Sequence, residues 1–145
     1  MSIDEAVSRL RAADHSWQTA LKQHRLAPPD AGYPHRLADL AEACAQQQSA
    51  YEFAHANGLV WDPTRVTDAI ELPHELQPTS GRYGDPKLWE QLDSASAQLA
   101  QALKGTSLDA IAHAFGEISL SARALSRDVA QIVASDPPHR LAPGS

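Results

Sequence analysis

The chain has 145 residues, a single cysteine and a formal net charge of −6, and alanine and leucine are frequent in it. This length fits one domain with one hydrophobic core, and a lone cysteine can form no internal disulfide. The acidic balance argues against the basic patch that nucleic-acid binding needs. Because no apolar run approaches the roughly 18 residues of a membrane span, and no secretory signal is recognisable, we expect a cytoplasmic protein without membrane or nucleic-acid partners.

Two helices are predicted in the first half of the chain. The first runs from about Ile3 to His24, where apolar residues recur every three or four positions, and Pro28-Pro29 follow it. The second begins near Pro34, a residue suited to a first helical turn. Asn57-Gly58 end it, because glycine accepts the left-handed conformation that follows many helices.

The second half predicts two more helices with clear boundaries. Asp85 is a candidate N-cap with Pro86 directly after it, and Gly105 closes this third helix. The fourth helix begins after Thr106 or Ser107, either of which can accept an amide hydrogen bond, and ends before Pro137-Pro138.

The fourth predicted helix has the most regular pattern in the chain. Its apolar residues alternate between spacings of three and four, as in a helix packed among others. The positions are Leu108, Ile111, Phe115, Ile118, Ala122, Leu125, Val129 and Ile132. The composition and this pattern predict an all-α fold, a four-helix bundle whose second and third helices are joined by a long crossover connection.

We expect one helical-bundle domain over residues 1–136, a long crossover segment over 58–85 and a flexible C-terminal tail over 137–145. The crossover is long enough to run the height of a bundle and to return the third helix parallel to the second. Asp62-Pro63 predict a short helix within it. Its aromatic residues, Trp61 and Tyr83, fit a lid on the core better than a ligand cage.

Candidate metal and catalytic residues are weak. Glu52-x-x-His55 has the spacing of a di-iron carboxylate motif but occurs once, and His113-x-x-x-Glu117 falls on the outward face of its helix. Cys44 takes a core position, where a thiol is unreactive. We therefore expect a protein that is not an enzyme and that uses no metal and no cofactor.

A weak ligand-binding site is predicted halfway along the bundle. Gln47 falls on the apolar stripe of the second helix, and a buried amide needs hydrogen-bond partners. Such a residue either fixes the register of the helices or lines a small polar cavity. The residues assigned to this cavity are Gln47, Gln48, Tyr51 and Asp14, with Trp61 and Tyr83 as its lid.

The leading functional hypothesis is a protein–protein interaction module that works as a homodimer or with another helical protein. It is motivated by the small and apolar residues of the last helix, including Leu120, which lies off the buried stripe. The alternative is a small-molecule-binding bundle with its pocket near the mid-bundle polar layer.

Overall fold

A computed structural model describes residues 3–26, 32–60 and 82–135. Most of these residues lie in four helices: α1 (Ile3–Arg25), α2 (Tyr33–Ala56), α4 (Pro86–Leu103) and α5 (Leu108–Ser135). The all-α four-helix bundle predicted from the sequence is therefore confirmed. None of the helices in these ranges combines the length and the apolar character needed to cross a membrane.

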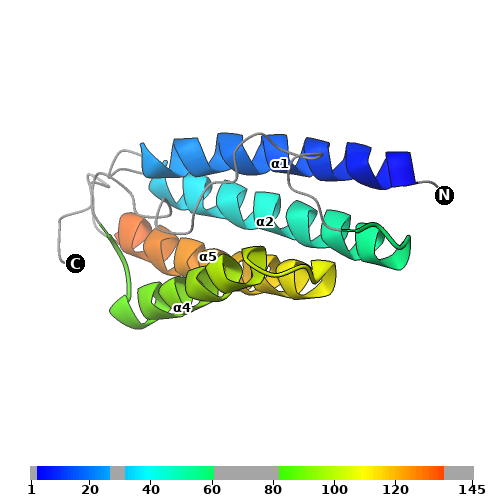
Figure 1. The fold of residues 1–145 in the computed structure, drawn as a ribbon. Helices are drawn as coiled ribbons and strands as arrows, with labels where there is room; N and C mark the ends of the chain where they lie inside the picture. The colour runs from blue at the N-terminus through cyan, green and yellow to red at the C-terminus, as the bar shows by residue number, and fades with distance from the viewer. Residues whose placement is uncertain (1–2, 27–31, 61–81, 136–145) are drawn as a thin grey trace.

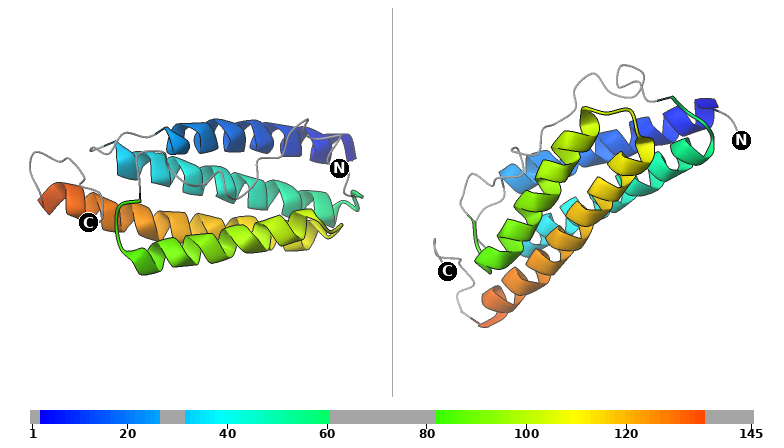
Figure 2. Two further views of the ribbon diagram at one scale, coloured as in Figure 1. Left: turned by 60° about the vertical axis from the view of Figure 1, so that its left-hand side comes forward. Right: turned by 60° about the horizontal axis from the view of Figure 1, so that its bottom comes forward.

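The helices run in an up-down-down-up order, which Figure 1 shows from one side and Figure 2 from two others. α2 packs on α1 and on α5, and α5 also packs on α4. The directions of the ribbons show that α4 runs parallel to α2, as the length of the connection between them predicted. The chain thus forms two antiparallel helical hairpins, which meet through α2 and α5.

The predicted helix ends are also confirmed. Asp85 caps α4, its Oδ1 accepting a hydrogen bond from the amide of Lys87 at 2.9 Å. Ser107 precedes α5, and its Oγ accepts one from the amide of Ala110 at 3.1 Å. Each cap satisfies an amide that the first helical turn leaves without a backbone partner. After α2, Gly58 adopts a φ of +73°, the conformation that favours glycine at this position.

The core is built around the buried stripe of α5. From Leu108 to Val129 every predicted stripe residue is at most 3% exposed, while Ile132 is only partly buried. Phe115 joins three helices: its ring meets that of Trp17 edge-on at a centroid distance of 5.3 Å and stacks on that of Tyr51 at 5.8 Å. The heptad pattern therefore marks the centre of the bundle.

Serine side chains tie α5 directly to the backbone of α2. Ser119 Oγ donates a hydrogen bond to the carbonyl of Ala41 at 2.8 Å, and Ser126 Oγ donates to that of Pro34 at 2.7 Å. A hydroxyl can reach a neighbouring helix backbone only where the two helices approach closely, and the buried alanines at this contact permit it. The polar residues here fix the pairing of α2 with α5.

The residues before α4 are anchored on the C-terminal half of α5. The amide of Asp85 donates to Asp128 Oδ2 at 2.7 Å, and Gly84 has a φ of +105°. A Cβ on Gly84 would lie 2.9 Å from Asp128 Oδ2 and 3.0 Å from Val129 Cγ2. Glycine is required here by both backbone conformation and space.

Several predictions concern residues outside the described ranges. They are the lid position of Trp61, the short helix from Asp62-Pro63 and the C-terminal tail over 137–145. The division into a domain, a crossover and a tail therefore stays a prediction.

Candidate functional site

The predicted mid-bundle site is centred on Gln47, which is 2% exposed. Its place on the buried stripe of α2 agrees with the sequence pattern. Its Oε1 atom is buried and accepts no hydrogen bond within the described part of the chain. A buried amide oxygen left without a donor costs about 1–3 kcal/mol, so this atom either weakens the core or meets a small polar molecule.

Tyr51 follows Gln47 by one helical turn and is also buried. Its ring stacks on Phe115, and burial together with the nearby charge of Asp14 raises the pKa of the phenol. Asp14 itself is partly buried and accepts a hydrogen bond from Gln18 Nε2 at 2.9 Å. The structure thus brings Gln47, Tyr51 and Asp14 to one region of the bundle, as predicted.

Trp17 belongs to the same region but was not predicted as a site residue. It is 1% exposed, packs on Phe115, and its indole Nε1 donates no hydrogen bond within the described residues. Buried tryptophans usually find an acceptor. A tryptophan within an apolar stripe is expected to be a core residue. The sequence alone therefore does not indicate that its indole donor lacks a partner among the described residues.

Gln48 has a different setting from Gln47. It is partly buried, and its amide occupies the space that Gly116 of α5 leaves free, since a Cβ on Gly116 would lie 2.7 Å from Gln48 Nε2. Gln48 therefore packs across the α2/α5 contact, and its amide fills a gap between helices.

Tyr83 does not join the mid-bundle site. Its ring meets that of Tyr33 at a centroid distance of 5.3 Å, and its carbonyl accepts a hydrogen bond from Trp89 Nε1 at 2.8 Å. Tyr33 begins α2, so Tyr83 lies at the end of the bundle where α4 also begins. Tyr83 therefore does not form the predicted lid over Gln47. Trp61 lies outside the described residues.

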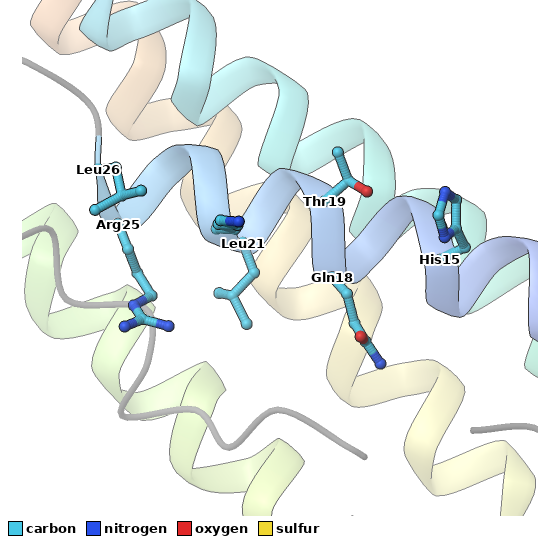
Figure 3. A pocket seen from close by; sticks show the side chains of 7 residues that line it. His15, Gln18, Thr19, Leu21, Arg25 and Leu26 are labelled. Atoms are coloured by element: carbon cyan, nitrogen blue, oxygen red, sulfur yellow. The ribbon is translucent and has the colours of Figure 1, made fainter. Parts of the chain in front are cut away.

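A pocket of about 370 Å³ lies along α1. The described residues that line it are His15, Gln18, Thr19, Leu21, Lys22, Arg25 and Leu26. Figure 3 shows Gln18, Leu21 and Arg25 pointing to one side of the helix and Thr19 pointing to the other. The labelled polar side chains of this pocket therefore do not converge on one point.

The candidate metal pairs lie on the surface. His113 Nε2 and Glu117 Oε1 are 3.7 Å apart on side chains that are 73% and 44% exposed, which confirms their predicted outward orientation. Glu52 and His55 are both exposed. The described residues hold no group of three or more side chains suited to a metal ion.

Cys44 is fully buried, and burial raises the pKa of its thiol. A buried thiol with a raised pKa is a poor nucleophile, because the thiolate is the reactive form. This agrees with the core position that the sequence predicted for Cys44.

The outward surface of α5 has a distinct composition. Leu120 is 66% exposed at its centre. Around it, at helical spacings of three, four and seven, lie His113, Glu117, Arg123, Ala124 and Arg127. We call Leu120 and these five residues the α5 outer face. Gly116 has a similar spacing from Leu120, but it is buried against Gln48 of α2 and is not part of this face. The α5 outer face combines one large apolar side chain with one small residue and charges of both signs.

No protein family, no curated protein and no solved structure matches this chain. The proposals for its function therefore start from two local features. The mid-bundle layer contains two buried polar atoms that have no hydrogen-bond partner among the described residues, and the α5 outer face places an apolar residue in solvent.

Proposed function

We propose that the protein is a non-enzymatic interaction module that binds a helix of another chain through the α5 outer face. The observation that carries the proposal is the exposure of Leu120 at 66%, in the middle of the longest helix. Removing an apolar side chain from water stabilises a complex by roughly 25 cal/mol per Å². Leu120 thus supplies the apolar contact around which a helix can dock.

The surroundings of Leu120 support this proposal. Single exposed leucines are common on soluble proteins, so exposure alone is weak support. Ala124 lies one turn after Leu120 and is small enough to let a second helix approach closely, whereas Gly116, one turn before Leu120, is buried against Gln48 of α2. Glu117 and Arg123 lie on opposite sides of Leu120 along the helix, and such charges set the orientation and the choice of a partner.

Site-specific photocrosslinking tests the proposal. A photoreactive amino acid is placed at Leu120, and a control at Ser94, which is exposed on α4. Both variants are expressed in the organism that carries the gene, and adducts are identified by mass spectrometry. We expect a discrete adduct from position 120 and none from position 94. The absence of an adduct at 120, at native expression level, would refute the proposal.

A second candidate function is the binding of a small polar molecule at the mid-bundle layer. The observation that favours it is that a buried donor, Trp17 Nε1, and a buried acceptor, Gln47 Oε1, both lack a hydrogen-bond partner among the described residues. A guest with both a donor and an acceptor would satisfy the two atoms together.

The free energy of unfolding of Gln47→Met separates this candidate from a packed layer. If no guest is bound, methionine of similar shape removes an unpaired acceptor and stabilises the protein by about 1 kcal/mol. If a guest is held, the same change destabilises by about 1–3 kcal/mol. Gln48→Met is the matched control, since Gln48 is only partly buried and takes no part in the layer.

A further inference from the structure

Resting on the proposed function, we propose that the partner of the α5 outer face is a second copy of this chain. The two α5 helices pack antiparallel about a two-fold axis that passes through Leu120. The inference comes from the order of residues on either side of Leu120, which makes the surface complementary to itself.

An antiparallel two-fold pair imposes a simple rule on its contacts. A residue a given number of positions after the axis lies against the residue the same number of positions before it on the other chain. With the axis at Leu120, the two leucines meet each other, and every contact made by one chain is repeated by the other.

The charges obey this rule. Glu117 stands three residues before Leu120 and Arg123 three residues after it, so Glu117 of one chain faces Arg123 of the partner subunit. The symmetry makes this ion pair twice. Both side chains are partly exposed, at 44% and 45%, and their contacts within the chain are long, at 3.7 Å and 3.9 Å. They are accessible to a partner.

The residues four positions from Leu120 are small but differ in exposure. Ala124, four residues after Leu120, is partly buried, whereas Gly116, four residues before it, is buried against Gln48 of α2. Neither residue projects far from the helix, so neither obstructs the leucine pair. One turn further out, His113 faces Arg127 of the partner subunit, a contact without attraction that leaves Glu117 and Arg123 to set the register.

One helix pair is a small interface. Stable complexes bury about 1,200–2,000 Å² in total, and a pair of helices meeting along a few turns falls at or below this range. We therefore expect a reversible dimer whose population rises with protein concentration.

Light scattering coupled to size exclusion gives the first test. The mass of the purified full chain is expected to rise from the 15.6 kDa of one chain toward twice that value as concentration increases. Glu117→Arg and Arg123→Glu each place like charges across the axis twice and should raise the dimer Kd about tenfold. The double variant E117R/R123E restores the opposite charges and should recover the Kd of the original chain.

A disulfide trap gives the second test and accumulates a sparsely populated dimer in covalent form. In a Cys44→Ala background, Leu120→Cys places two cysteines at the axis, where they meet. Ser94→Cys in the same background is the matched control. Under mild oxidation we expect L120C to form covalent dimers much faster than S94C. Circular dichroism checks that every variant keeps its helical fold.

The outcomes separate this inference from the proposed function. Failure of E117R/R123E to recover dimerisation, or equal rates for L120C and S94C, overturns the two-fold dimer. If position 120 also crosslinks to a different protein, the interaction module stands and only the second copy as its partner is wrong. If the chain is monomeric and position 120 yields no adduct at all, both proposals fall.

Discussion

The pair formed by α2 and α5 and the pair formed by α1 and α4 occupy the same bundle but are held differently. α2 and α5 make the broadest contact and are joined by serine hydroxyls that reach the backbone of the neighbouring helix. α1 and α4 meet through large rings, with His24 and Trp89 at a centroid distance of 6.4 Å. Small residues let α2 and α5 pack closely, whereas bulky aromatic residues fill the space between α1 and α4.

The two contacts are therefore sensitive to different substitutions. A closely packed pair resists any added atom, because its neighbours have no space to give. A pair spanned by aromatic rings is harmed by truncation, because each lost ring leaves a cavity. The bundle thus has one region that should be intolerant of larger residues and one that should be intolerant of smaller ones.

The largest expected effect comes from removing the ring that links the two regions. Phe115→Ala should lower the free energy of unfolding by about 3–5 kcal/mol, since the ring contacts both Trp17 and Tyr51. Chemical denaturation measures it. His113→Ala is the control on the same helix and should change stability by less than about 0.5 kcal/mol. Similar losses of stability for the two variants would contradict the burial of Phe115 in the core and the exposure of His113.

A smaller loss is expected where α4 is anchored on α5. Gly84→Ala should cost about 2–4 kcal/mol, because both the φ of +105° and the contact with Asp128 oppose a Cβ. Gly58→Ala is the matched control, since its φ is also positive, at +73°, but nothing lies within 4 Å of the added atom. Thermal denaturation should rank Gly84→Ala clearly below Gly58→Ala. An equal effect would show that space at Gly84 is not limiting.

Enlarging a residue at the α2/α5 contact tests its close packing. Ala41 is fully buried, and its carbonyl accepts the hydrogen bond from Ser119. Ala41→Leu should destabilise by about 1–3 kcal/mol. Ala38→Leu, at an exposed position on the same helix, should have little effect. A neutral Ala41→Leu would mean that the two helices have room between them.

The buried acidic groups of α2 predict a loss of stability at high pH. Burial raises the pKa of Cys44 from its ordinary 9.0 and that of Tyr51 from its ordinary 10.0. Above these values the unfolded chain releases protons that the folded chain retains, so stability falls as pH rises. We expect a loss of about 1–2 kcal/mol between pH 8 and pH 10. Cys44→Ala should flatten this dependence, and an unchanged slope would show that the thiol does not contribute.

The helices and their ends could be predicted from the sequence because local chemistry determines them. Asp85 with Pro86, Ser107, and Gly58 each act within a few residues of their own position. The outward position of His113 followed from the heptad pattern in the same way. Periodicity along one helix identifies which side is buried without knowledge of the partner helices.

The candidate site was harder to predict because it depends on how helices distant in sequence meet. Gln47 could be placed in the core, but the free donor on Trp17 could not, since its state depends on what surrounds the indole. Tyr83 was assigned as a lid over Gln47, yet it pairs with Tyr33. The length of the crossover indicated the direction of α4, but it does not determine which side chain Tyr83 packs against.

The up-down-down-up order has a consequence for how the chain folds. α1 with α2 and α4 with α5 are hairpins of neighbouring helices, and in the described residues the backbones of the two hairpins approach most closely where α2 packs on α5. Hairpins of neighbouring helices form fast because little chain entropy is lost in closing them. Docking the hairpins closes a much longer loop and comes later. Substitutions at the serine contacts between α2 and α5 should therefore slow docking and leave the formation of each hairpin unchanged.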